Sequence, residues 1–451
     1  MAAPDVVKDI KHLIRENKVL SEADARLARD AGLLPITSID RLAMNDGVIY
    51  EPTDLAIAEL APMLTGATPS ARLTLAKAAG TLQCLVLLVD FPDNTGNTNP
   101  DHFRKLLFDA NDPNSMRTFY RELSYGKLDI DGVVTGWLRA PHPYSYYTNG
   151  ASGTGNTFPN NTPGLLRDAL QIFTATQSLA PFDANQDGYV DGLFLVHAGG
   201  GAEVDPVPAA RPHKIWSHKW VLPSGFTNNG VKAYAYFTAP EDGRLGVFSH
   251  EFGHFLGLPD LYDTTYRSRG VGNWCLMSGG SWGGGGDRPT RLSAWCLEEL
   301  GWIKPTKIKA KTTVTLKSLE GDPKQCYRLD LKGEPKHEYF LVENRQQTGR
   351  DAELPGAGLA LWHIDMSQGS NTNALAYRVG LVQADGKRDL EFNRNAGDPG
   401  DLFPGTGKVT KVSSSTAGHP NTVSNGGTAT RIKLANIVLN AGGTVSVDLS
   451  V

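Results

Sequence analysis

The stretch VFSHEFGHFLGLPDLYD, from Val247 to Asp263, decides how the rest of the sequence is interpreted. It contains two histidines four residues apart, His250 and His254, with Glu251 directly after the first. On an α-helix, positions i and i+4 lie one turn apart on the same face. The stretch therefore predicts a helix over residues 243–257 that presents two imidazoles side by side.

Two imidazoles in this arrangement can bind one zinc ion, at roughly 2.0–2.1 Å from each nitrogen. Gly257 can adopt a positive φ and end the helix, so that the chain turns sharply and carries Asp260 round as a third ligand. The fourth position is then left open for water. Glu251 can reach that side, take a proton from the metal-activated water and later pass it to a leaving amine.

Two other interpretations of the stretch stay open. The first is an apolar core helix whose histidines lie on the surface. The second is a zinc site whose third ligand is a glutamate on a later helix, for which Glu298 and Glu299 in CLEELGW are available. Met277, in NWCLMSGGSW, favours Asp260 instead. In metzincin peptidases a methionine turn follows the zinc motif and forms a hydrophobic floor under the metal.

Several separated motifs make the chain similar to the immune inhibitor A family of secreted zinc metallopeptidases, the M6 group. From about residue 81 to residue 405 they are LVLLVDFPD, FYRELSYGKLDIDG, HEFGHFLGLPDLYD, GNWCLMSGGSW, RLSAWCLEELGWI, YFLVENRQ, LPGAGLALWHID, LVQADGKRDLE and GDPGDLFPG. The resemblance implies a zinc-dependent endopeptidase, exported from the cell. It implies His250, His254 and Asp260 as zinc ligands and Glu251 as the general base.

A catalytically silent protein that keeps the zinc scaffold and only binds other molecules is the alternative from another functional class. The intact Glu251 argues against it, because binding zinc does not require this carboxylate.

The expected fold is α+β, with a metzincin-like catalytic domain at residues 79–305 and a β-rich C-terminal domain at residues 306–451. Residues 1–78 differ from the rest, since their apolar residues recur at helical spacing before a linker-like stretch, APMLTGATPSAR. We interpret them either as a small helical extension or as a prosegment that covers the cleft and keeps a zymogen latent.

Shorter patterns predict the elements around the motif. The runs LQCLVLLVDF and GYVDGLFLVHAG are typical of buried strands. TPGLLRDALQIF and RLSAWCLEELGW predict helices, and SMRTFYRELSYGKLDIDGVVTGWL predicts a helix followed by a hairpin. After residue 306, β-branched or alternating runs predict strands in TTVTLKSL, CYRLDLKG, EYFLVENRQ, GLALWHID, RVGLVQAD and TVSVDLSV.

Two acidic segments are candidates for calcium, which family members often bind. DANQDGYVD follows a calcium-loop pattern at steps one, three, five and nine, with Asp183, Asn185, Asp187 and Asp191. Its twelfth step is Phe194 rather than glutamate, so an Asp/Asn/Gly turn before a strand is the alternative. QADGKRDLEFNRNAGDPGDLFPG contains a second acidic cluster, for which a solvated loop is the alternative: Asp385, Asp389, Asp398 and Asp401.

The composition limits the partners of this 451-residue chain. A formal net charge of -4 does not favour nucleic acid or an acidic membrane as the main partner. The resemblance to the family implies protein or peptide substrates. No apolar run reaches the length of a membrane span. The start, MAAPDVVKDIKHLIRENK, lacks the apolar core of a secretory signal, so export rests on the resemblance alone. The lone histidines are interpreted as structural or exposed: His197, His213, His218 and His363.

Overall fold

A computed structural model describes residues 78–331 and 337–451 of the chain. The expected N-terminal segment therefore lies outside the described residues, except for Ala78. The described chain divides into two compact units. The first unit holds residues 78–121 and Lys127–Leu258, and the second holds Glu122–Gly126 and Pro259–Val451. Both contain sheets and helices, which confirms a mixed α/β protein; the three-part domain division stays a prediction.

The first unit is built on a five-stranded sheet in the order β2-β1-β3-β5-β4. Its strands run parallel except β4, which pairs antiparallel with β5. The strands are β1 (Gly80–Asp90), β2 (Leu128–Arg139), β3 (Gly192–His197), β4 (His218–Asn228) and β5 (Val231–Pro240). The central strands β1 and β3 are the two apolar runs predicted as buried strands, and every residue of β3 is buried.

The predicted hairpin after the helix at residue 116 is wrong. Residues Leu128–Arg139 form the single strand β2, which pairs in parallel with β1. Gly132 and Gly136 lie within this strand. A Cβ on Gly132 would lie 2.4 Å from the backbone oxygen of Cys84, so this glycine permits a close approach of two strands rather than a reversal.

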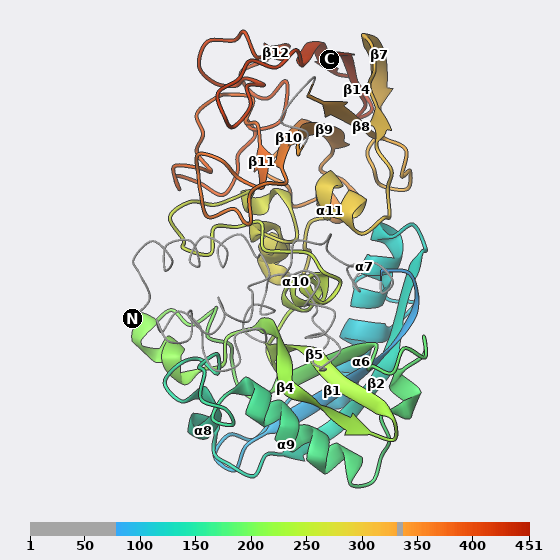
Figure 1. The fold of residues 1–451 in the computed structure, drawn as a ribbon, viewed down its shortest axis with the longest axis vertical. Coiled ribbons are helices and arrows are strands. Elements are labelled where there is room, and N and C mark those ends of the chain that lie inside the picture. The colour runs from blue at the N-terminus through green and yellow to red at the C-terminus, as the bar shows by residue number, and fades with distance from the viewer. Residues whose placement is uncertain (1–77, 332–336) are drawn as a thin grey trace, which may run out of the picture. The chain divides into compact units, whose positions relative to one another are not determined.

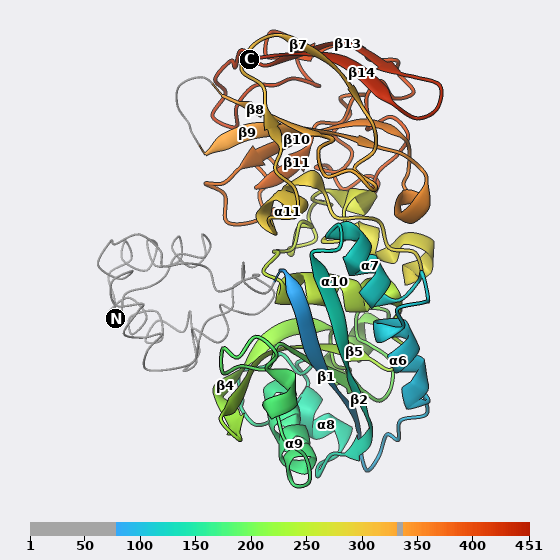
Figure 2. The same cartoon turned by 90° about the vertical axis from the view of Figure 1, so that its right-hand side faces the viewer.

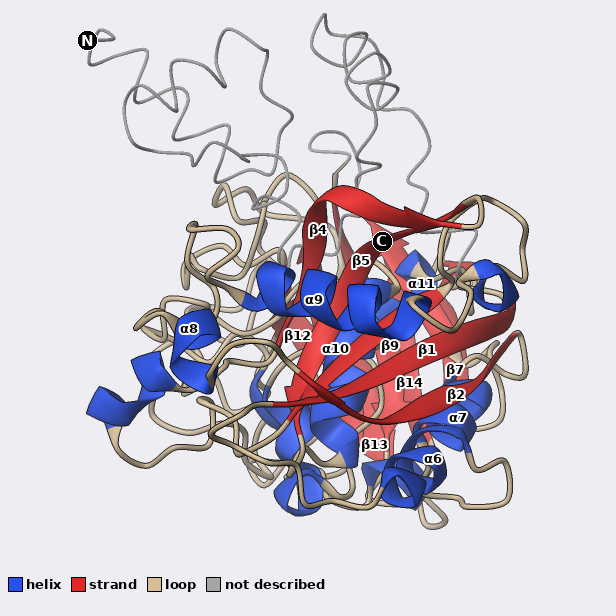
Figure 3. Cartoon of the chain, turned by 90° about the horizontal axis from the view of Figure 1, so that it is seen from below, coloured by secondary structure: helices blue, strands red, loops and turns tan. Residues whose placement is uncertain are grey.

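Helices cover both faces of this sheet. Helix α9 (Thr162–Thr174) crosses one face, and α6 (Pro100–Phe108) and α10 (Leu245–Phe255) lie on the other (Figures 1 and 3). On the second face, Phe194 of β3 contacts Phe108 and Phe252. These aromatic contacts fix α10 against the sheet. The unit also contains α7 (Met116–Leu123, ending past the unit boundary), α8 (Tyr144–Thr148), η1 (Ala180–Phe182) and η2 (Pro208–His213).

The second unit begins with short helices and continues as strands. The helical elements are η3 (Gly272–Trp274), η4 (Gly279–Gly286), α11 (Ala294–Glu299) and η5 (Gly349–Asp351). One sheet has the order β11-β10-β9-β8-β6, and the other has the order β12-β13-β14-β7 (Figure 2). In chain order the strands are β6 (Thr306–Lys307), β7 (Thr312–Leu316), β8 (Cys326–Asp330), β9 (Glu338–Arg345), β10 (Gly358–Asp365), β11 (Val379–Leu381), β12 (Val412–Ser413), β13 (Lys433–Leu439) and β14 (Val445–Ser450).

One apolar core joins the two sheets of the second unit. It contains Phe340 of β9 and Leu361 of β10 from one sheet, with Leu434 of β13 and Val447 of β14 from the other. Side chains that alternate along each strand meet in this core, as in two sheets packed face to face. Within the described part of the chain, every helix is too short or too polar to cross a membrane.

Candidate active site

The histidine motif lies on α10, where every residue from Leu245 to Phe255 is buried. Phe252 packs against Tyr120, whose hydroxyl donates to the Ser249 carbonyl at 2.5 Å. The exposed fractions are 0% for His254, 5% for Glu251 and 9% for His250. This burial contradicts the interpretation of surface histidines on a core helix. Buried imidazoles and a buried carboxylate are costly to desolvate, which is expected where they serve a site.

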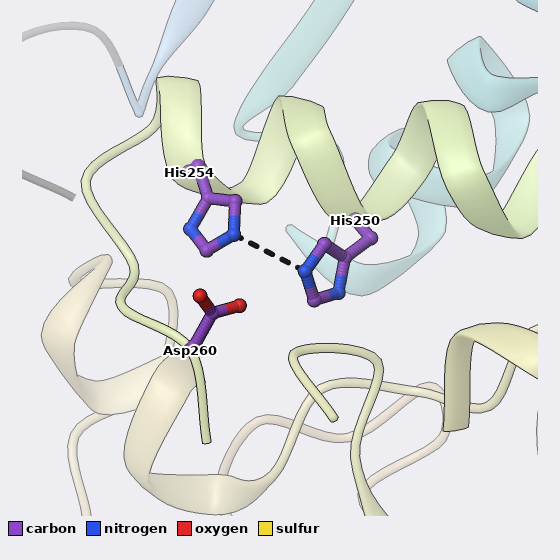
Figure 4. Close-up of side chains that lie close together, drawn as sticks. All are labelled: His250, His254 and Asp260. Carbon is purple, nitrogen blue, oxygen red and sulfur yellow. Dashed lines mark hydrogen bonds between the residues drawn. The ribbon is translucent and has the colours of Figure 1, made fainter. Parts of the chain in front are cut away.

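The two imidazoles converge as their spacing predicts. Their Nε2 atoms lie 3.1 Å apart (Figure 4). Two nitrogens bound at 2.0–2.1 Å to one tetrahedral ion are about 3.3 Å apart, so the pair has nearly the separation that zinc requires.

A backbone carbonyl orients His254. Its Nδ1 lies 2.7 Å from the oxygen of Leu258, so Nδ1 carries the proton and donates to this oxygen. The lone pair of Nε2 is then directed towards His250. When one ring nitrogen of a histidine binds a metal, a hydrogen bond donated by the other ring nitrogen fixes the tautomer and the orientation of the ring. The sequence motif did not reveal this contact, because any residue at position 258 supplies the same carbonyl.

The end of α10 carries Asp260 towards the imidazoles. Gly257 has a φ of 102° and its N–H donates to the His254 carbonyl, while the Leu258 N–H donates to the Gly253 carbonyl. This pair of bonds is the Schellman motif, which reverses the chain and favours glycine at this position. One ligand atom from each of His250, His254 and Asp260 lies within 4.8 Å of the others. Figure 4 shows the Asp260 carboxylate facing both rings.

The segment after Asp260 is held by the turn that contains Met277, between η3 and η4. The Leu261 N–H donates to the Met277 carbonyl at 2.7 Å, and Asn371 Nδ2 donates to the Leu261 carbonyl at 2.8 Å. Met277 is fully buried. The observed contribution of Met277 is thus a backbone contact beside Asp260, and its role as a floor under the metal stays a prediction.

Glu298, the alternative third ligand on a later helix, forms hydrogen bonds with other residues of the second unit. Glu298 of α11 accepts from Arg328 Nη1 at 3.3 Å and from Tyr339 Oη at 3.4 Å. Burial raises the pKa of Glu298, and Arg328 opposes that rise. Among the described residues, the histidine pair groups with Asp260 rather than with Glu298.

The first acidic segment folds as a loop that bonds to itself. Asp183 accepts the backbone N–H groups of Asp187 and Gly188, both at 3.0 Å, and Asn185 Nδ2 donates to Asp187 at 2.9 Å. Asp191 accepts the N–H groups of Gln83 and Ala184 through one carboxylate oxygen. These are the contacts of an Asp/Asn turn. Calcium binding by this segment stays a prediction.

The second acidic segment is only partly brought together. Asp385, Asp398 and Asp401 place one oxygen each within 4.8 Å of the others. Asp389 instead bonds to Arg394 Nη1 at 3.2 Å. The sequence placed all four in one cluster, and the structure groups three of them.

Residues 78–303, half of the chain, match the family described as "Immune inhibitor A peptidase M6, catalytic domain". The chain belongs to this family. It is 33% identical over 261 residues to the protein named Immune inhibitor A from Bacillus thuringiensis subsp. alesti, covering 46% of this chain and 38% of that protein. It is 33% identical over 270 residues to "Pre-pro-metalloprotease PrtV" of Vibrio cholerae serotype O1 (strain M66-2), covering 48% of this chain and 29% of that protein.

The family membership confirms the resemblance found in the sequence and the prediction of a metallopeptidase catalytic domain. The chain spans well under half the length of the curated relatives that it matches. The donor set of two imidazole nitrogens and one carboxylate oxygen fits zinc, for which three protein ligands and one open position are typical of catalytic sites.

Proposed function

We propose that this protein is a zinc-dependent endopeptidase that hydrolyses peptide bonds in proteins. The observation that carries the proposal is the convergence of His250, His254 and Asp260 in one buried group, and the buried Glu251 directly follows His250 on the same helix. Family membership supports the reaction class, and the nitrogen and oxygen donors support zinc as the metal. The backbone bond from Leu261 to Met277 supports a metzincin-like arrangement, because it holds the residue next to Asp260.

The protein's own groups have separate tasks in this reaction. Bound zinc supplies a Lewis acid that lowers the pKa of water and polarises the scissile carbonyl. His254 is held in its ligating tautomer by the Leu258 carbonyl. The Glu251 carboxylate accepts the proton of the attacking water and delivers it to the departing amine nitrogen, a role that typically contributes 10²–10⁴-fold to rate.

Cleavage of an unfolded protein such as casein tests the proposal, with zinc content measured for every sample. The wild type is expected to cleave, and zinc-loaded Glu251→Gln is expected to be at least about 100-fold slower. Glu353→Gln, which changes a partly exposed glutamate paired with Arg288, is the matched control and is expected to cleave like the wild type. If zinc-loaded wild type does not cleave even without residues 1–78, the protein belongs to the silent binding class instead.

Three further parts of the proposal rest on the sequence. Export from the cell follows from the resemblance to the family. Calcium at Asp183, Asn185, Asp187 and Asp191 follows from the loop spacing. Inhibition by residues 1–78 concerns a segment that lies outside the described chain except for Ala78. Its test is the removal of this segment, which is expected to raise casein cleavage, and unchanged activity would contradict it.

A further inference from the structure

Cys275 and Cys296 face each other inside the second unit. Their Sγ atoms lie 3.8 Å apart without a bond between them, and both side chains are fully buried. Cys275 follows η3 in the turn that contains Met277, and Cys296 lies on α11. The two cysteines are 21 positions apart in the sequence, so their contact joins two segments that the fold brings together.

Strand β9 holds the main chain on both sides of this contact. Arg345 Nη1 donates to the carbonyl of Trp274, the residue before Cys275, at 2.9 Å. Glu343 Oε1 accepts from the N–H of Ala294, at the start of α11, at 3.1 Å. Glu343 and Arg345 lie two positions apart on β9, and both are buried. The sulfurs therefore meet because the anchored main chain brings them together, and not through one side-chain rotation alone.

Ser293, which is fully buried, donates a hydrogen bond to each of the two sulfurs. Its backbone N–H donates to Cys275 Sγ at 3.3 Å, and its Oγ donates to Cys296 Sγ at 3.4 Å. A thiol sulfur is a weak acceptor, whereas an ionised acceptor forms hydrogen bonds that are roughly twice as strong. The two donors of Ser293 therefore favour a thiolate in the pair.

These hydrogen bonds make the two thiols differ in acidity. Burial opposes the ionisation of Cys275, but hydrogen bonds from Cys296 and from the Ser293 N–H hold the pKa of Cys275 below its usual range. Burial raises the pKa of Cys296, and its hydrogen bond to Cys275 raises it further. Cys275 thus carries the negative charge more readily, while Cys296 keeps its proton. A thiolate beside a thiol is the pair of groups from which a disulfide forms by exchange.

We propose that Cys275 and Cys296 are oxidised to a disulfide bond that ties the turn containing Met277 to α11. Closing the sulfur separation from 3.8 Å to the bond length of about 2.05 Å moves each sulfur by about 0.9 Å. Side-chain rotation covers a distance of this size, so the anchored main chain can stay in place. Among the described residues, neither cysteine belongs to a group of three side chains that could hold a metal ion, so a metal does not explain the pair.

A low-molecular-weight disulfide, such as oxidised glutathione, is the oxidant. The Cys275 thiolate attacks one of its sulfurs, which forms a mixed disulfide and releases a glutathione thiolate. That thiolate takes the proton of Cys296, whose own thiolate then attacks the Cys275 sulfur and releases the second glutathione. The second glutathione takes up the proton that Cys275 gave to water, so two protein thiols are oxidised and one glutathione disulfide is reduced to two thiols. Because both sulfurs are buried in the folded chain, this exchange is expected during folding, before α11 packs.

The disulfide would stabilise a turn that contacts the segment of the third zinc ligand. The Met277 carbonyl accepts from the Leu261 N–H, next to Asp260. A disulfide restricts the unfolded chain between its two cysteines, and such bonds persist in proteins outside the cell. The link to zinc and the extracellular setting rest on the proposed function, whereas formation of the bond does not.

Mass spectrometry of the full chain tests the bond without using peptidase activity. The chain is refolded with reduced and oxidised glutathione, and the remaining thiols are blocked with iodoacetamide in denaturant. Two of the four cysteines are expected to escape blocking, and a tryptic digest is expected to contain two peptides joined through Cys275 and Cys296. Cys84→Ala, which changes a buried cysteine of the first unit, is the matched control and is expected to keep the joined peptides. Four blocked cysteines in the wild type, or a bond to Cys326 instead, would overturn the proposal.

Unfolding temperature gives the second measurement, on wild type refolded either with glutathione or in dithiothreitol. The bonded chain is expected to unfold several degrees above the reduced chain, because the bond restricts the unfolded state. Cys296→Ala is expected to unfold at the same temperature under both conditions, and Cys84→Ala is expected to keep the difference of the wild type. Equal unfolding temperatures for the bonded and the reduced wild type would show that the bond does not tie the turn to α11.

Discussion

The two groups of metal-ligating side chains differ in how the chain assembles them. His250 and His254 are one turn apart on a single helix, and Asp260 follows after one glycine turn. Asp385 and Asp401 come instead from two loops that backbone hydrogen bonds hold together. The first geometry depends on local rules of helix periodicity and helix termination. The second depends on the tertiary fold, so it is much harder to recognise in a sequence.

The largest expected effect concerns the histidine group. His254→Ala removes a zinc ligand, so we expect stoichiometric zinc to be lost and casein cleavage to fall to background. Elemental analysis and casein cleavage assays measure the two quantities. His213→Ala, which changes an exposed histidine, serves as the control and should behave like the wild type. Full zinc content and full casein cleavage in His254→Ala would contradict the assignment of this histidine as a zinc ligand.

Other buried histidines show that burial alone does not mark a metal ligand. His197 and His218 are buried in the first unit, where His218 Nδ1 donates to the Trp216 carbonyl at 2.7 Å and its Nε2 lies 3.2 Å from the Tyr236 hydroxyl. Burial lowers the pKa of each from 6.5 to about 4. The folded state therefore resists protonation more than the unfolded state. The contribution of these two neutral histidines to the free energy of unfolding is complete above about pH 6.5, and it is lost as the pH falls towards 4.

The free energy of unfolding is thus expected to drop by up to ~3 kcal/mol per histidine across that pH interval. Urea unfolding at several pH values, comparing the wild type with His197→Gln, measures it. The variant is expected to have a shallower acid dependence, whatever its stability at pH 7. His213→Gln is the control. Identical slopes for the wild type and His197→Gln would contradict the role of burial.

The smallest expected effect concerns the turn that delivers Asp260. Gly257→Ala places a side chain at a φ of 102°, which costs about 1–2 kcal/mol and shifts the residues that follow. We expect a matching loss of unfolding free energy and weaker zinc binding, without loss of the fold. Gly136→Ala, on an exposed part of β2 with free space around the Cβ, is expected to change neither quantity. Unaltered zinc affinity in Gly257→Ala would show that the turn does not position Asp260.

Local sequence patterns predicted much of the fold, and the elements that were predicted wrongly or missed have physical reasons. The apolar runs of β1 and β3 and the helices α9 and α10 were predicted because burial on one or both faces leaves a direct pattern in the sequence. The hairpin predicted in β2 failed, because Gly132 serves a close strand contact rather than a turn. The hairpin of β4 and β5 was missed, although Asn229 and Gly230 have the positive φ values that an Asn-Gly turn favours.

The same contrast holds for the sites. Residue types and their spacing predicted the group of His250, His254 and Asp260, and the structure brings these three side chains together. The hydrogen bond between His254 Nδ1 and the Leu258 carbonyl could not be predicted, since every residue type has the same backbone carbonyl. Asp398 and Asp401 were candidates from composition alone. Their grouping with Asp385, and the exclusion of Asp389, required the pairing of two loops.

The zinc affinity of three chains tests the central claim most directly: the wild type, Asp260→Ala and Glu298→Ala, each titrated with zinc in competition with a chromophoric chelator. The account predicts one zinc site in the wild type, an affinity at least about tenfold weaker in Asp260→Ala, and an unchanged affinity in Glu298→Ala, whose carboxylate bonds to Arg328 and Tyr339. Full affinity in Asp260→Ala, with the loss appearing in Glu298→Ala, would contradict the assignment of the third ligand and the catalytic geometry built on it.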